Sequence, residues 1–276
     1  MSFHIIASST GIVALLCMLW SRKTRKLLAH KSLLLLMNVH SFWTFLVCLT
    51  TLINSSITLH SLLTMRNPSD IFVTASTCVW RTAPVMITSF GSIFSQMTMA
   101  AERYRASTNL SNYEYTNKTT GHLLNAVHIA AVIFFWYVHI VIYRSDWIAT
   151  HCTLVNPSRE AINTVIAFFV FLCEVTTLLS FKLLLSRNIR LRDNKDAGLT
   201  LSERYQLTEN IRMLKVMNPI IRSHTSLGMV GASFYLTLKI IFPSPGMYPL
   251  IEETINVLYL QGICMPLIFY YRFRSD

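Results

Sequence analysis

The chain of 276 residues is 53% hydrophobic and 13% charged, and its basic residues outnumber its acidic ones to give a formal net charge of +11. Soluble domains carry about 25% charged residues, so this composition excludes an ordinary soluble protein. The basic residues lie between long apolar segments rather than over one surface. This arrangement argues against nucleic-acid binding and is typical of a protein embedded in membrane lipid.

Seven apolar segments are long enough to cross a bilayer, which takes roughly 20 helical residues. In chain order they are Phe3–Trp20, Ser32–Ile53, Arg81–Ala101, Gly121–Tyr143, Ala161–Leu184, Val216–Phe242 and Leu250–Tyr271. The third is the least apolar, and its small and hydroxyl residues suit a helix packed inside a bundle. We therefore predict an all-α polytopic membrane protein, a seven-transmembrane-helix bundle that forms one domain over residues 1–276.

The distribution of lysine and arginine predicts the orientation of this bundle. With the N-terminus outside, nineteen basic residues fall in the inner segments and five in the outer ones. Because cytoplasmic segments carry the excess of Lys and Arg, we expect the N-terminus to lie outside. Asn54, in the sequon Asn54-Ser55-Ser56, then falls on the outer side and is a candidate for glycosylation.

Two of the six cysteines, Cys78 and Cys152, fall at the edges of apolar segments on the predicted outer side, where disulfides form and persist. A bridge between them would tie the loop before the fifth segment over the third; the alternative is two free thiols. The sequence has no CxxC spacing, no HExxH and no Walker A motif. We therefore expect no metal site, no cofactor and no enzymatic activity.

The tripeptide Glu102-Arg103-Tyr104 lies at the inner end of the third segment. An arginine there either pairs with the neighbouring carboxylate or turns towards a cavity opened by another helix. The alternative is an ordinary interfacial anchor, since Arg and Tyr are common at membrane edges. Seven segments, an outer N-terminus and the outer cysteine pair together favour a switch role.

A polar stretch, residues 199–212, precedes the sixth apolar segment. Thr200 and Glu203 fit a capping box at a helix start, so we expect the sixth helix to extend well into the cytoplasm. Its charged residues Arg204, Glu209 and Arg212 are candidates for contact with a cytoplasmic partner. The alternative is a solvated charged helix that has no partner.

The same stretch, Leu201-Ser202-Glu203-Arg204-Tyr205-Gln206-Leu207-Thr208-Glu209-Asn210-Ile211-Arg212, resembles the LSxRYQLxEN signature of the nematode serpentine chemoreceptors of the Sra superfamily, and class AB is the most similar. The resemblance covers roughly the third to seventh segments. It implies a seven-helix G-protein-coupled receptor for chemical cues, in the plasma membrane of sensory neurons and in their cilia. The rhodopsin-like motifs CWxP and NPxxY are absent, so the resemblance does not carry the rhodopsin-type switch in detail.

Glu174 lies near the middle of the fifth segment. A carboxylate at bilayer depth is costly and suggests a functional site, here one for a cationic or hydrogen-bonding ligand. The alternative is a protonated or internally paired structural acid, because buried polar groups usually find partners.

These features together predict a receptor that binds a small external ligand and activates a heterotrimeric G protein. A transporter or channel is the first alternative, and it would need several ionisable residues at bilayer depth and helices broken by Gly or Pro. A seven-helix scaffold without a ligand is the second.

Overall fold

The computed structural model describes residues 1–24, 31–65, 73–110, 119–143, 148–149, 160–194, 198–241 and 257–274. Within these ranges the chain forms seven α-helices, which confirms the predicted seven-helix bundle. They are α1 (Ser2–Thr24), α2 (Lys31–Thr64), α3 (Ala75–Thr108), α5 (Thr119–Tyr143), α6 (Glu160–Asp193), α7 (Leu201–Ile241) and α9 (Gln261–Arg274). A short 3-10 helix, η4 (Leu258–Leu260), leads directly into α9.

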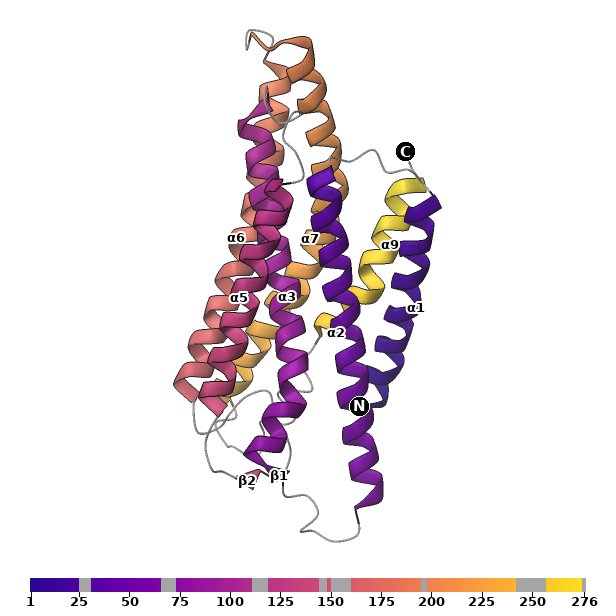
Figure 1. Ribbon diagram of the computed structural model, residues 1–276, viewed down its shortest axis with the longest axis vertical. Helices are drawn as coiled ribbons and strands as arrows, with labels where there is room; N and C mark the ends of the chain where they lie inside the picture. Colours follow the sequence, from indigo (N-terminus) through magenta and orange to yellow (C-terminus); the bar gives the residue numbers. More distant parts are fainter. Residues whose placement is uncertain are drawn as a thin grey trace.

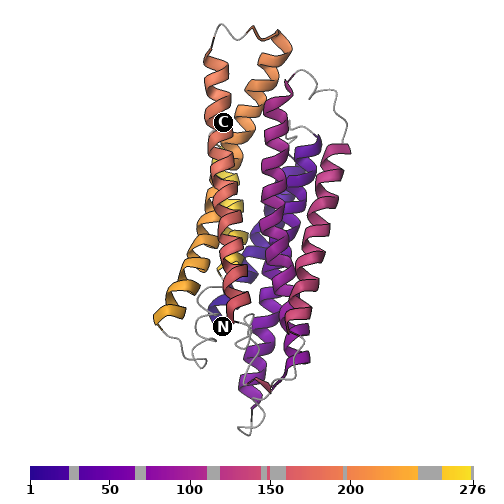
Figure 2. The ribbon, with the colours of Figure 1, turned by 90° about the vertical axis from the view of Figure 1, so that its left-hand side faces the viewer.

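The helices run along the long axis of an elongated bundle (Figure 1). Helix α3 lies in the interior, where it contacts α2, α5, α6 and α7, and α9 packs between α1 and α7. The C-terminal end of the chain lies at the end of the bundle towards which α6 and α7 project, and the N-terminus lies nearer the other end (Figures 1 and 2).

The helices are longer than the predicted membrane segments. Helices α2, α3 and α6 have 34 residues each and α7 has 41. At 1.5 Å per residue a helix of 34 residues is about 50 Å long, compared with about 30 Å for the hydrocarbon core of a bilayer. Each of the seven predicted segments overlaps a helix, and residues 250–256 of the last segment lie outside the described residues.

Four helices within the described ranges are long and apolar enough by themselves to cross a membrane, namely α1, α2, α5 and α6. Helix α3 does not meet this standard because it contains many serine and threonine residues and a glutamine. Several of these polar side chains lie inside the bundle, where Ser92, Ser95 and Gln96 are almost fully buried. Helix α7 has a polar first half, and α9 with η4 is short. These three helices therefore depend on packing against their neighbours.

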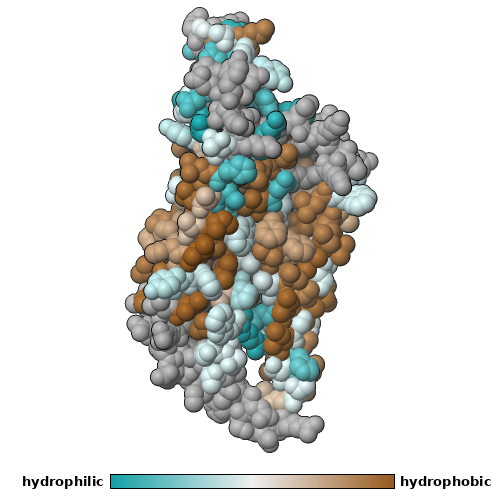
Figure 3. All heavy atoms as spheres, viewed as in Figure 1, coloured by the Kyte–Doolittle hydropathy of each residue, from teal (hydrophilic) through white to brown (hydrophobic). Residues whose placement is uncertain are grey.

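The outer surface of the bundle is apolar over the middle of its length. Large hydrophobic side chains on several helices are at least half exposed, among them Val13, Leu16, Phe134, Val165 and Leu183. On the face shown in Figure 3, hydrophobic side chains cover most of the middle, and hydrophilic ones gather where α6 and α7 project. Such a wide apolar surface is unfavourable in water and favourable in lipid, so the chain is a membrane protein.

The start of α7 has the predicted capping box. The Thr200 backbone N–H donates to Oε2 of Glu203 at 2.9 Å, and the Glu203 N–H donates to Oγ1 of Thr200 at 3.3 Å. The Thr200 hydroxyl also donates to Oε2 of Glu203, at 2.8 Å. The bonds that the carboxylate accepts from the Thr200 backbone N–H and hydroxyl lower the pKa of Glu203. Two of the free N–H groups at the helix start are thereby satisfied, which explains why α7 begins so far before its apolar half.

Candidate functional site

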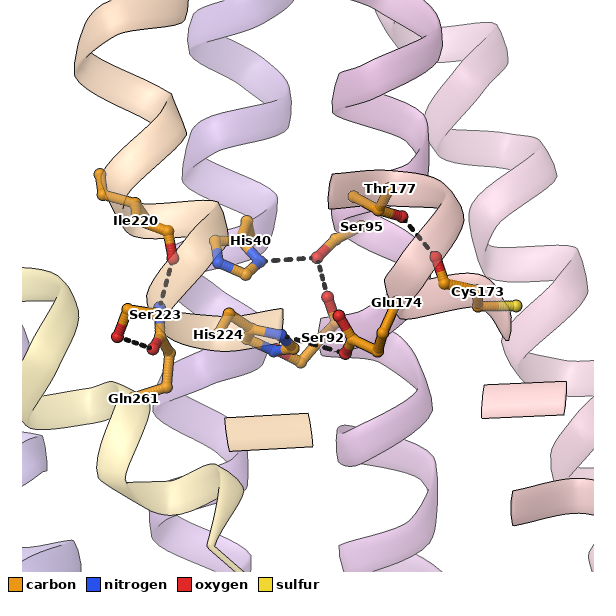
Figure 4. Close-up of polar contacts among 10 residues, drawn as sticks. All are labelled: His40, Ser92, Ser95, Cys173, Glu174, Thr177, Ile220, Ser223, His224 and Gln261. Atoms are coloured by element: carbon orange, nitrogen blue, oxygen red, sulfur yellow. Dashed lines mark hydrogen bonds and ion pairs between the residues drawn. The ribbon is translucent and has the colours of Figure 1, made fainter. Parts of the chain in front are cut away.

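A buried polar network crosses the middle of the bundle and joins four helices (Figure 4). It consists of His40 on α2, Ser92 and Ser95 on α3, Glu174 on α6 and His224 on α7. Each of these residues is at most 2% exposed. Ionisable groups this deep in a membrane protein are costly unless they are paired, and they commonly mark functional positions.

The contacts in this network run continuously from α6 to α2. Oε1 of Glu174 lies 3.2 Å from Nδ1 of His224, and Nε2 of the same ring lies 2.9 Å from Oγ of Ser92. The Ser95 hydroxyl donates to the Ser92 carbonyl oxygen at 2.6 Å and lies 2.8 Å from Nδ1 of His40. A displacement of Glu174 would therefore change contacts made by side chains on α7, α3 and α2.

Glycine at position 228 lets the Glu174 carboxylate approach the backbone of α7. A Cβ atom added there would lie 2.8 Å from Oε1 of Glu174, closer than non-bonded atoms tolerate. The carboxylate is thus held between the His224 ring and the α7 backbone. Helices α6 and α7 contact each other extensively, so Glu174 and His224 lie within a large interface between two helices.

The sequence left two interpretations of Glu174, a ligand-binding acid or an internally paired one. The structure gives the carboxylate an internal partner, His224, which sequence reasoning missed. Both His224 and His40 lie inside apolar segments. A polar side chain at bilayer depth suggests a functional or paired residue, and this could have identified both histidines from the sequence. Nothing in the sequence told which helix each ring would face.

A second buried cluster lies near the C-terminal end of α3, the end that the sequence predicts to face the cytoplasm. Arg103 contacts the carboxylate of Glu102 through Nε and Nη2, both 2.6 Å from Oε2. Its Nη1 donates to Oδ1 of Asn210 on α7 at 2.9 Å. Both charged residues are at most 2% exposed, so the charge-assisted hydrogen bonds form in a region that largely excludes water.

Ser107 extends this cluster to a third helix. Its Oγ accepts hydrogen bonds from Nδ2 of Asn210 at 2.8 Å and from Nδ2 of Asn188, on α6, at 3.0 Å. The hydroxyl itself donates to the Arg103 carbonyl oxygen at 2.8 Å. Buried polar side chains thus join the C-terminal parts of α3 and α6 to the N-terminal part of α7. The sequence predicts these parts to lie on the inner side, so we call this group (Glu102, Arg103, Ser107, Asn188, Asn210) the inner cluster.

The structure pairs two of the predicted switch residues, Glu102 and Arg103, with each other. Tyr104 is 58% exposed, and Arg204 and Arg212 are exposed on the extension of α7. Glu209 is partly buried. The residue that reaches Arg103 is Asn210, one position after Glu209 in the signature stretch, and sequence reasoning did not single it out.

On the opposite side of the bundle, Cys78 is disulfide-bonded in the first turns of α3, and Cys152 lies outside the described residues. The strands β1 (Val73–Thr74) and β2 (Ile148–Ala149) pair as an antiparallel ribbon directly before α3. The ribbon brings the segment before Cys152 to the start of α3. The proposed bridge is therefore compatible with the backbone arrangement.

Asn54 lies inside α2, and its Oδ1 accepts a hydrogen bond from Nε of Arg81 at 3.1 Å. The second contact of this arginine is with the Thr58 hydroxyl. Glycosylation of Asn54 stays a prediction.

The comparisons with known proteins agree with this architecture. The profile of a family described as serpentine type 7TM GPCR receptor class ab chemoreceptors matches residues 1–276. The chain belongs to this family. Serpentine receptor class alpha/beta-14 of Caenorhabditis elegans is 27% identical over 282 aligned positions, which cover 97% of this chain and 69% of that protein. Serpentine receptor class epsilon-27 of the same organism is 28% identical over 188 positions, 63% of this chain and 45% of that protein.

Membership confirms the resemblance of the signature stretch and makes the chain a receptor-like chemosensory membrane protein. The family is a receptor class and not an enzyme family. Among the residues that the structure describes, no group of three or more His, Cys, Asp or Glu side chains is placed to hold a metal ion.

Proposed function

We propose that the chain is a chemosensory receptor that binds a small external molecule and activates a heterotrimeric G protein. The observation that carries this proposal is the contact between Arg103 and Asn210. It joins the inner end of α3 to the inner end of α7, the two elements whose separation would open a cytoplasmic surface.

The proposed orientation has the N-terminus outside, because nineteen basic residues then face the cytoplasm and five the exterior. In this orientation the inner cluster lies on the cytoplasmic side, and Cys78 with its bridge to Cys152 lies outside. The plasma membrane, and the cilia of sensory neurons in particular, is the location that this function requires.

The mechanism we propose is a shift of population between two forms. A ligand that enters from outside among α3, α6, α7 and α9 binds more tightly to the form in which the inner end of α7 has moved away from α3. Glu174 and His224 lie between the outer ends of these helices and the inner cluster. A ligand that disturbs their contact would weaken the hold of α6 on α7 and favour the open form.

The proposed surface for the G protein is the extension of α7 together with the inner end of α3. Arg204 and Arg212 are exposed there, Glu209 is partly exposed and Tyr104 lies nearby on α3. Opening would add Arg103 to this surface, because its bond to Asn210 would be broken. An exposed cationic surface is suited to an acidic partner segment.

The test is ligand-driven signalling in cells that express the chain and variants at matched surface level. A panel of small odorants and water-soluble cues is applied, with calcium and cyclic nucleotide as readouts. Arg103→Ala is expected to abolish the response. The matched control is Arg192→Ala, because this arginine is exposed on α6 and, among the residues that the structure describes, pairs with Asp193 alone.

An unchanged response in Arg103→Ala would show that Arg103 has no switch role. Silence of the unsubstituted chain to every compound, with good surface level, would favour a ligand-less scaffold. Compound-driven currents or uptake without a second-messenger signal would favour a channel or transporter.

A further inference from the structure

A cavity of about 990 Å³ lies between α3 and α6. Its wall on α3 includes Met97, Ala100 and Tyr104, and its wall on α6 runs from Thr176 to Leu191, with Asn194 directly after the helix. The volume is at the upper end of the range of ligand pockets, roughly 300 to 1,000 Å³. We call this cavity the α3–α6 groove.

The groove is open to the side of the bundle and not to its interior. Ala101, Tyr104 and Leu183 line it and are exposed, whereas Arg103 on α3 is buried and contacts α7. A groove on the lateral surface of a membrane-spanning bundle faces lipid. Its occupant therefore comes from the bilayer.

The groove is amphipathic along its length. Its deep part is formed by apolar side chains such as Leu184 and Met97, together with the small residue Ala100, whereas its far end holds two guanidinium groups, Arg187 and Arg190. Both arginines are exposed, and within the described part of the chain neither makes an ion pair with a carboxylate. Their charges are available to an anionic group.

The dimensions match one leaflet of a bilayer. Ten residues separate Thr177 from Arg187, which is about 15 Å along the helix axis, and half of the hydrocarbon core is also about 15 Å. With Arg187 at the boundary between headgroups and hydrocarbon, Thr177 lies at the bilayer midplane. An acyl chain that begins at the arginines would end near Thr177.

We propose that the α3–α6 groove binds an anionic glycerophospholipid, with its phosphate against Arg187 and Arg190 and an acyl chain along the apolar floor. Guanidinium groups bind phosphate through paired hydrogen bonds. The arginine end faces the cytoplasmic leaflet in the orientation proposed above, and this leaflet holds most of the anionic lipid. Binding itself needs neither an agonist nor a G protein.

The test is native mass spectrometry of the purified, delipidated chain with phosphatidylserine or phosphatidylcholine added at equal concentration. We expect phosphatidylserine to bind more tightly. The double variant R187Q/R190Q should lose this preference, roughly fivefold for each arginine and about 25-fold for the pair. The matched control K182Q/R192Q removes the same charge from exposed positions on α6 that do not line the groove, and should keep the preference.

A second variant, Ala101→Phe, fills the groove without changing charge. It should reduce the binding of phosphatidylserine, whereas Leu179→Phe, exposed on α6 outside the groove, should not. Soluble glycerophosphoserine should fail to compete, because the acyl chain holds the lipid in the groove. Gel filtration confirms that each variant is folded.

Three results would overturn the proposal. Equal binding of the two lipids would indicate a nonspecific lipid shell, and equal losses in R187Q/R190Q and K182Q/R192Q would indicate an effect of net charge. Full competition by glycerophosphoserine would indicate a site for soluble anions. Because no signalling is measured, these results are independent of the receptor function proposed above.

Discussion

Asn210 offers the sharpest test of the proposed switch, because its amide forms two buried hydrogen bonds to α3. Its Oδ1 accepts a hydrogen bond from the Arg103 guanidinium at 2.9 Å, and its Nδ2 donates one to Oγ of Ser107 at 2.8 Å. Asn210→Ala removes both. A charge-assisted hydrogen bond contributes about 1.5 to 3 kcal/mol and a neutral one about 1 kcal/mol, so the closed form should lose at least about 2 kcal/mol.

This loss is large enough to change the population of the two forms. About 2 kcal/mol corresponds to roughly a 30-fold change in equilibrium constant, so an open form at about 1% would rise to about 20%. Ligand-independent second-messenger signalling of Asn210→Ala, measured at matched surface level, should rise accordingly. Hydrogen exchange at the inner end of α7 in the purified protein should also become faster.

Two control variants separate the switch from general damage. Thr208→Ala removes an exposed hydroxyl that donates to the Arg204 carbonyl oxygen one turn earlier in the same helix, and it should leave basal signalling unchanged. Asn210→Asp keeps the size of the side chain and loses the donor to Ser107, but it places a carboxylate against Arg103. The charge-assisted bond to Arg103 is worth more than the neutral bond that is lost, so basal signalling should stay well below that of Asn210→Ala. Unchanged basal signalling in a well-expressed Asn210→Ala, or an equal rise in Thr208→Ala, would refute the reasoning.

Three further predictions concern stability. His224→Ala leaves the Glu174 carboxylate buried without its partner and should cost about 3 kcal/mol, seen as a lower Tm in detergent; an unchanged Tm would show that the pair contributes little. Cys78→Ser removes the disulfide at the start of α3 and should cost about 2 to 5 kcal/mol, lowering the surface level; a normal level would contradict this. The capping bonds lower the pKa of Glu203 in the folded protein. They stabilise the start of α7 fully at pH values above the pKa of Glu203 in the unfolded chain, and this stabilisation is lost as pH falls through its pKa in the folded protein. Hydrogen exchange at the first turn of α7 should therefore rise in acid, and Glu203→Gln should remove this dependence.

The sequence was most informative about features that depend on neighbouring residues. Long apolar segments predicted helices that cross a membrane, because the bilayer demands about 20 such residues in a row. The capping box was predicted correctly because Thr200 and Glu203 are three residues apart and need no third group. The signature stretch around Arg204 predicted the family because it is also a continuous run of neighbouring residues.

The sequence did not reveal which residues the buried polar side chains contact. Arg103 and Asn210 are 107 residues apart, and nothing near either of them indicates the other. Glu174 was recognised as unusual because of its depth, but its contact with His224 requires that α6 and α7 present these faces to each other, with glycine at position 228 to admit the carboxylate.

By itself the sequence determined that the chain is a bundle of seven membrane helices, that most basic residues lie on one side and that α7 begins with a capping box. Those properties follow from hydropathy, charge and local hydrogen bonding. The tertiary structure decided how each helix is rotated and which helices are neighbours, and hence the Glu174–His224 contact, the inner cluster and the α3–α6 groove. A helix presents a different residue every 100° or so, and only packing against the other helices decides which one meets a partner and which one meets lipid.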